Sequence, residues 1–269
     1  MSATCRQIIE AMEKYAPQCL REEGDNVGLL AGSTERVVRK VLVMLEVTDM
    51  TVEEAVAVGA DMIVAHHPII RKGVSRITDA DAGGRRLLKL IQNGVAVYAA
   101  HTNLDSAEGG VNDVLFDLLA LSSKEPLLPP KDGFSYGLGR IGDLSEAMPL
   151  GQFADFVKNA LGAPFVTYCG DASAMVRRVA VLGGGGAKAE IFALAAQKGC
   201  QAYVTGDLTH HMAHEACDCS LGVIDASHYY TEAVANRAIV DVLRRHCAEN
   251  GLNVAICMSK TDGQVIKLA

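Results

Sequence analysis

Two stretches of the chain repeat the same patterns in the same order. Residues 37–45 (VVRKVLVML) match residues 175–183 (MVRRVAVLG), each with two apolar residues, two cations and an apolar run. Residues 59–67 (GADMIVAHH) match residues 199–207 (GCQAYVTGD) at nearly the same offset. Such self-similarity constrains the fold strongly, because each copy must form a comparable structural unit. We therefore expect two similar α/β domains.

A third match concerns histidines and acids that follow apolar, strand-like runs. His101–Asp105 and His228–Glu232 share the spacing His-x3-acid, which on a helical turn puts both side chains on one face. Imidazole and carboxylate groups gathered in this way suit a divalent metal site, and we expect one that holds two ions. The complete set is His66, His67, His101 and Asp105 in the first copy, and Asp207, His228 and Glu232 in the second.

Apolar runs alternate with amphipathic segments along the chain. Strands that alternate with helices indicate mainly parallel sheets covered by helices, with ligands bound beyond the carboxyl ends of the strands. The stretch 122–142, rich in proline and glycine, predicts a boundary between domains of residues 1–126 and 127–269. The expected helices are 4–16, 51–58, 83–94, 150–161, 187–198 and 231–248, the last beginning at the Glu232 motif; the expected strands are 37–47, 61–65, 95–100, 176–182 and 201–205, with a terminal hairpin of 253–258 and 263–268.

Composition excludes several classes of protein. A chain of 269 residues with 49% hydrophobic residues can bury a large core. The net charge of −7 and the 5% aromatic content argue against nucleic-acid binding. The charged N-terminal segment does not resemble a signal peptide, and no apolar run reaches the roughly 18 residues of a membrane span. Eight cysteines without a C-x-x-C pair favour free thiols in a reducing cytoplasm.

Five motifs resemble the NIF3-like family, whose members are also described as GTP cyclohydrolase type 2 homologs. They occur in family order over nearly the whole chain. One departure is Gly24, which stands where family members usually carry tryptophan before DNVG. The motifs are DNVGLLAG (25–32), AHHP (65–68), HTNLDSAEGGVND (101–113), GDLTHH (206–211) and SHYYTE (227–232).

The resemblance implies two similar α/β domains, a ring-shaped homohexamer and a dinuclear metal centre between the domains. A pair of ions can activate water for hydrolysis, and Glu232 is the natural candidate for a bridging carboxylate. The resemblance narrows the substrate to a purine nucleotide such as GTP. A non-catalytic metal carrier or scaffold is the alternative, and Zn, Mn, Fe, Co or Ni all suit such ligands. The implied ligands are His66, His67, Asp105, His228 and Glu232.

For several other residues the sequence leaves two possible roles open. His101 fits a position around the ligands, where it would orient Asp105 or a metal-bound water. His210, His211 and His214 either contact a substrate phosphate or cap a turn. The glycines at 183–186 form either a tight strand-to-helix turn or a phosphate-binding loop.

Overall fold

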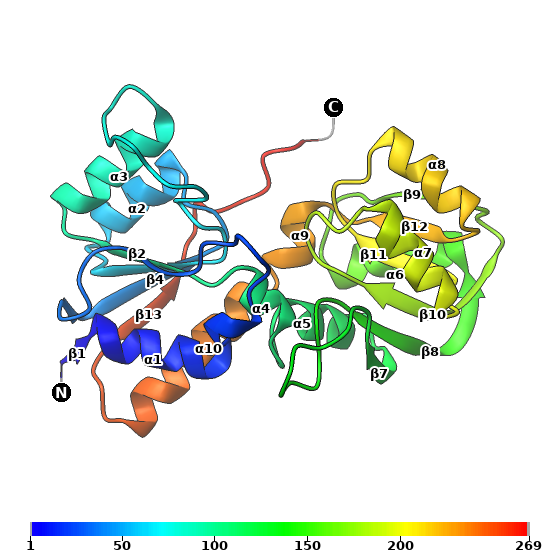
Figure 1. The fold of residues 1–269 in the computed structure, drawn as a ribbon, viewed down its shortest axis with the longest axis horizontal. Helices are drawn as coiled ribbons and strands as arrows, with labels where there is room; N and C mark the ends of the chain where they lie inside the picture. Colours follow the sequence, from blue (N-terminus) through cyan, green and yellow to red (C-terminus); the bar gives the residue numbers. More distant parts are fainter. Residues whose placement is uncertain (1, 268–269) are drawn as a thin grey trace. The chain divides into compact units, whose positions relative to one another are not determined.

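The computed structural model describes residues 2–267 (Figure 1). They form two compact units, each with its own sheet. The first unit takes the residues up to Ala107 and those from Ala235 onward, and the second takes Glu108–Val234. The expected fold class, two α/β units, is confirmed.

The first unit is built on a five-stranded sheet in the order β13-β4-β5-β6-β2. Neighbouring strands are parallel except for β2, which runs antiparallel to β6. All four residues of β5 are buried, as expected for a strand covered on both faces. Helices α2 and α3 lie on one face and α1 and α10 on the other (Figure 1). The bounds are α1 Cys5–Tyr15, β2 Gly28–Ala31, β4 Lys40–Met44, α2 Asp49–Ala57, β5 Met62–Ala65, α3 Ala82–Gln92, β6 Ala96–Ala99, α4 Thr102–Ser106, α10 Ala235–Glu249 and β13 Ala255–Met258, with the short elements β1 Ala3–Thr4, η1 Gln18–Leu20 and β3 Val37–Val38.

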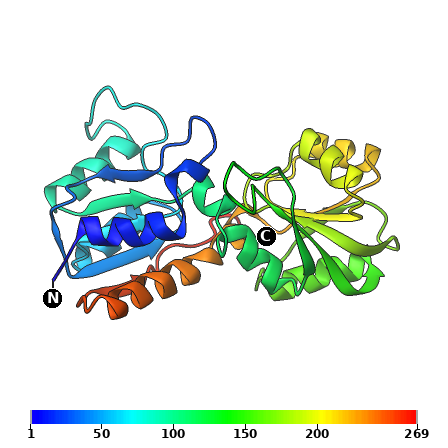
Figure 2. The same ribbon diagram turned by 60° about the horizontal axis from the view of Figure 1, so that its bottom comes forward.

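The second unit has a six-stranded sheet in the order β7-β8-β10-β11-β12-β9. Only β10, β11 and β12 are mutually parallel, so this sheet is mixed whereas the first is mainly parallel. Helices α7 and α8 lie on one face of it and α5 and α6 on the other (Figure 2). The bounds are α5 Val111–Leu118, β7 Ser122–Pro126, β8 Arg140–Pro149, α6 Leu150–Ala160, β9 Thr167–Cys169, β10 Met175–Val181, α7 Ala189–Gln197, β11 Ala202–Thr205, α8 His210–Asp218, β12 Gly222–Asp225 and α9 His228–Glu232.

The repeat inferred from the sequence is present in the topology. Strands β4, β5 and β6 lie side by side and parallel, with β2 antiparallel at the edge; β10, β11, β12 and β9 have the same arrangement. The matched apolar runs form β4 and β10, and the second pair of matched runs forms β5 and β11. Each set ends in a five-residue helix, α4 or α9, that carries the His-x3-acid motif or most of it.

The two repeats exchange their C-terminal segments. Helix α5 follows the first repeat but packs on β8 and β10 of the second unit, and β7 pairs with β8. Helix α10 follows the second repeat but packs on α1, and β13 pairs with β4. The compact units therefore differ from the expected division at residues 126 and 127. The composition of the sequence indicates a boundary where proline and glycine become frequent. It does not show that β13, at the end of the chain, pairs with β4 near its start.

Two local expectations were wrong. Strand β13 pairs in parallel with β4, not in a hairpin, and residues 259–267 contain no strand; residue 268 lies outside the described residues. The expected closing helix is divided in two, since α9 ends at Glu232 and α10 begins at Ala235. Over residues 2–267, no helix combines the length and the apolar character that crossing a membrane requires.

Candidate metal-binding clusters

The first cluster lies at the carboxyl ends of β5 and β6. The amides of His66 and His67 donate to the carbonyls of Met44 and Leu45, so the pairing of β5 with β4 continues through both histidines. Both side chains are buried, with His66 1% and His67 5% exposed. One donor atom from each of His66, His67 and His101 lies within 4.8 Å of the others. The first repeat therefore gathers three imidazoles that could hold an ion.

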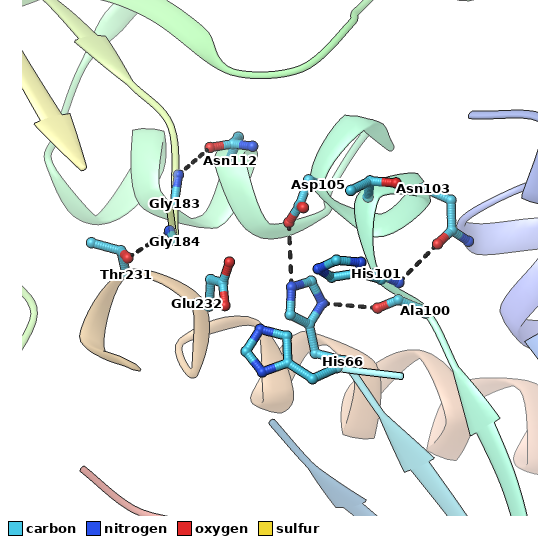
Figure 3. Close-up of polar contacts among 12 residues, drawn as sticks. His66, Ala100, His101, Asn103, Asp105, Asn112, Gly183, Gly184, Thr231 and Glu232 are labelled. Atoms are coloured by element: carbon cyan, nitrogen blue, oxygen red, sulfur yellow. Dashed lines mark hydrogen bonds and ion pairs between the residues drawn. The ribbon is translucent and has the colours of Figure 1, made fainter. Parts of the chain in front are cut away.

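Each of these imidazoles has its Nδ1 nitrogen bonded to an oxygen that can only accept. His66 Nδ1 lies 2.8 Å from the Ala100 carbonyl oxygen (Figure 3). His67 Nδ1 lies 2.6 Å from a Glu46 carboxylate oxygen. A carbonyl or carboxylate at Nδ1 keeps the proton there, so the lone pair of the neutral ring lies on Nε2. Metal-binding histidines have the same arrangement: one ring nitrogen donates to a nearby acceptor, and the other is free to bind the metal.

His101 is held by the DNVG loop. Its Nδ1 lies 2.8 Å from Asp25 Oδ1, and Asp25 also accepts from the amide and hydroxyl of Thr102. Burial works to raise the pKa of Asp25, but the hydrogen bonds from His101 and Thr102 outweigh it and hold that pKa well below its usual range. The DNVG loop thus lines the cluster through Asp25.

Asp105 is buried on α4 and approaches His66. Its Oδ1 lies 3.6 Å from His66 Nε2 (Figure 3). The sequence predicted that His101 would orient Asp105 or a metal-bound water; the Nδ1 nitrogen of its ring bonds Asp25 rather than Asp105. His101 is the residue before the first turn of α4, where the chain has not yet adopted helical angles, so the helical spacing argument does not hold there.

The second cluster pairs one histidine with two acids. His228 Nε2 lies 2.9 Å from Glu232 Oε2 across one turn of α9, and His228 Nδ1 lies 2.8 Å from Asp207 Oδ2. The expected facing of His228 and Glu232 is therefore confirmed. The hydrogen bond to buried Glu232 raises the pKa of His228 to about 9; burial opposes this shift and Asp207 reinforces it. A bound cation would take the place of that proton between the imidazole and the carboxylate.

Glycines make room for the second cluster. Gly184 has a φ of +69°, and a Cβ there would lie 1.9 Å from Glu232 Oε1. The amide of Gly183 donates to Asn112 and that of Gly184 to Thr231 (Figure 3). The amide of Gly186 donates to the Gly184 carbonyl. Since these three amides donate within the protein, the contacts support the tight-turn interpretation of residues 183–186.

One residue of the site was not identified from the sequence. Glu46 lies two residues beyond the end of β4, at the sheet edge where the histidines lie, and its carboxylate fixes the ring of His67. Its position just beyond an apolar run was the available signal. The remaining histidines of the GDLTHH region, His210, His211 and His214, are exposed on α8.

The chemistry of these side chains fits divalent cations. Imidazole nitrogens and carboxylate oxygens, without a thiolate, are ligands for borderline and harder first-row ions. In the first cluster, acceptors at Nδ1 of His66 and His67 fix the tautomer that a metal requires. In the second, Asp207 would keep the proton on Nδ1 of His228 once a cation replaced the proton at Nε2. The first cluster belongs to the first unit and the second cluster to the second unit.

Comparison with known proteins identifies the family. The family model for Duf34/NIF3 (NGG1p interacting factor 3) matches residues 3–264. The chain belongs to the Duf34/NIF3 family. A relative from Clostridium acetobutylicum, named GTP cyclohydrolase 1 type 2 homolog, is 32% identical over 263 residues and covers 97% of both chains. A relative of the same name from Streptomyces coelicolor is 36% identical over 231 residues, covering 84% of this chain and 80% of its own.

Solved structures of the family share the fold. The Bacillus cereus protein related to NIF3 superposes with a TM-score of 0.93 at 29% identity, covering 100% of this chain and 99% of its own. The Staphylococcus aureus hypothetical protein SA1388 gives a TM-score of 0.91 at 26% identity, with complete coverage of both chains. The resemblance inferred from the five motifs is thus confirmed.

Proposed function

We propose that this Duf34/NIF3 protein binds two divalent metal ions and uses them for hydrolysis. The proposed ligands are His66, His67 and Asp105 from the first repeat and His228 and Glu232 from the second. The observation that supports this most strongly is the acceptor found at Nδ1 of His66, His67 and His228. Metal-binding histidines almost always donate their other ring N–H to a carboxylate or a backbone carbonyl, and these contacts have that form.

The protein's own groups would supply positioning and proton transfer. Bound divalent ions would polarise the substrate and lower the pKa of water toward neutrality. Glu46 and Asp207 would keep the rings of His67 and His228 in place during turnover. His101, held at Nδ1 by Asp25 and partly exposed, could accept or release a proton at Nε2. No serine or cysteine nucleophile is required by this scheme.

The proposed substrate class is a purine nucleotide such as GTP. Support for it comes from the name shared by the relatives, GTP cyclohydrolase 1 type 2 homolog. In that reaction type, water attacks the imidazole carbon of the purine, which suits a metal-activated water.

A non-catalytic metal carrier or scaffold is the second candidate. The near-complete burial of His66 and His67 favours it, because a buried ion exchanges slowly and is retained. Turnover of a nucleotide panel with several added metals separates the two functions. Metal-dependent release of product supports the hydrolase. Tight metal binding without turnover of any nucleotide supports the carrier.

Metal analysis of tag-free protein tests the ligand set. We expect about two divalent ions per chain, as in dinuclear hydrolases, and the loss of at least one in His67→Ala. His246→Ala, in the last turn of α10, is the matched control and should keep both ions. An unchanged ion count in His67→Ala would remove His67 from the ligands.

The bridging role of Glu232 has a separate test. Glu232→Gln keeps the shape of the side chain but removes its charge and weakens one oxygen donor. If Glu232 bridges, this variant lowers the occupancy of both ions, whereas Asp105→Asn affects mainly one. Loss of a single ion in Glu232→Gln, with the other fully retained, would exclude bridging.

We also propose that the chain assembles as a homohexamer, as the family resemblance implies. Light scattering at micromolar concentration measures the mass directly. A mass six times that of the 28.5 kDa chain supports the proposal, and a monomeric mass contradicts it.

A further inference from the structure

Helix α8 carries three histidines within its first five residues, outside both clusters described above. The rings of His210 and His214 have centroids 4.7 Å apart, and the rings of His210 and His211 have centroids 5.5 Å apart. All three side chains are exposed. Three neighbouring imidazoles on an exposed helix have no evident role in stabilising the fold, since the core contacts of α8 come from other residues.

The buried side of α8 fixes the orientation of these histidines. Ala216 is fully buried, and Met212 and Cys219 pack against the core of the second unit. The helix is also capped, because the Thr209 side chain accepts from the amide of Met212. The face that carries His210 and His214 is therefore presented to solvent on a rigid element, which reduces the entropy lost when both rings bind one ion.

The spacing of His210 and His214 suits chelation. Residues four apart on a helix lie on the same face one turn apart. Two histidines at this spacing form the zinc-binding part of the H-E-x-x-H motif. Here His211 stands in place of the motif's glutamate, so the pair has the ligands of that motif without its general base. Exposed Glu215 and Asp218 on the same helix add negative charge that attracts cations.

We propose that His210 and His214 form an additional binding site for one borderline divalent ion, such as Ni²⁺ or Zn²⁺. Imidazole nitrogens select such ions over Mg²⁺ and Ca²⁺. Water would complete the coordination, so the ion would exchange readily with solution. The positive end of the helix dipole at the first turn weakens this site relative to the same pair in the middle of a helix. It would therefore serve for transient metal binding rather than permanent retention.

Equilibrium dialysis of tag-free protein against saturating Ni²⁺ tests the proposal. His214→Gln and the double variant His210→Gln/His211→Gln should each bind one ion per chain fewer than the wild type, because neither keeps two imidazoles on one face of α8. His246→Gln on α10 is the control for loss of a lone histidine and should match the wild type. Circular dichroism should show all three variants folded, since the substituted side chains lie outside the core.

Anomalous scattering from Ni²⁺-soaked crystals locates the ion. We expect a peak between His210 and His214 that is absent in His214→Gln. Equal ion counts in the wild type and both α8 variants, or no peak on α8 at saturating Ni²⁺, would overturn the proposal. The test is independent of the proposed hydrolase, because it measures a difference between proteins that share the same two clusters.

Discussion

The two repeats place different side chains at the same position of their sheets. His67 follows β5 in the first repeat, and Asp207 follows β11 at the matching position of the second. In the first repeat, Glu46 holds the ring of His67; in the second, Asp207 itself holds the ring of His228. The contact between a carboxylate and Nδ1 is thus common to both, although the residues that make it come from different elements. The repeat preserves an arrangement of groups rather than individual residues.

A second difference follows the first strand of each repeat. Glu46 after β4 corresponds to Gly184 after β10, given the offset of 138 between the matched runs. The glutamate reaches a histidine, whereas the glycine leaves the space that the Glu232 carboxylate occupies. Each repeat therefore brings a carboxylate to its histidine, from a strand end in one case and from a helix in the other.

The largest expected effect is a loss of stability when a residue that anchors α5 or α10 is replaced. Helix α5 is anchored in the second unit by Asp113, which pairs with the fully buried Arg140. Asp113→Ala leaves that guanidinium without its carboxylate and should lower the free energy of unfolding by about 3–5 kcal/mol. On α10, buried Asn236 makes a longer contact to Asp262, at 3.4 Å, and Asn236→Ala should cost about 1 kcal/mol. Urea denaturation measures both. Equal losses would show that the two helices are anchored alike.

The next effect is on stability and metal binding at Gly184, the position in the second repeat that matches Glu46 in the first. Gly184→Ala places a Cβ against Glu232 and forces a left-handed backbone on alanine, which costs about 1–2 kcal/mol before any displacement of Glu232. We expect lower stability together with loss of metal from the second cluster. Gly162→Ala is the control, since Gly162 has a φ of +62° and no atom within 4 Å of a Cβ. If both variants behave alike, crowding at Glu232 is not the cause.

Metal affinity tests whether the shared carboxylate contact has the same role in both repeats. Glu46→Ala and Asp207→Ala should each weaken metal binding by about 10- to 100-fold, the usual effect of removing a group that orients a ligand. Competition with a chelating dye measures the affinities. Glu125→Ala, an exposed acid away from the clusters, should leave them unchanged. An effect in only one repeat would show that the contacts are similar in geometry but not in role.

Much of this arrangement could be predicted because it depends on local patterns. The apolar runs defined β4, β5, β10 and β11, and strand ends pointed to the histidines. The exchange of α5 and α10 could not be predicted, since it depends on which sheet a distant strand joins. Glu46 was missed for a related reason: its partner, His67, is 21 residues away, and only the sheet register brings them together. Gly184 was placed in a turn, but the sequence did not show that it makes room for Glu232, because these residues are 48 positions apart.

The smallest effect is a loss of stability at residues 259–261, which follow β13 and bond to Glu54. Glu54 on α2 accepts hydrogen bonds from the hydroxyls of Ser259 and Thr261 and from the amides of Lys260 and Thr261. Burial works to raise the pKa of Glu54, but these hydrogen bonds outweigh it and lower that pKa. A carboxyl with a lowered folded pKa stabilises the protein above its unfolded pKa, about 4.3 for glutamate, and this contribution is lost as the pH falls through the folded value.

Glu54→Gln should therefore cost about 1 kcal/mol of unfolding free energy at pH 7, and the difference from the wild type should shrink below about pH 4. In the second unit, exposed Glu125 pairs with Arg178, and Glu125→Gln should cost only a few tenths of a kcal/mol. Urea midpoints at pH 7 and pH 3.5 give both values. A pH-independent cost for Glu54→Gln would mean that the charge of Glu54 does not hold the segment, and that shape alone does.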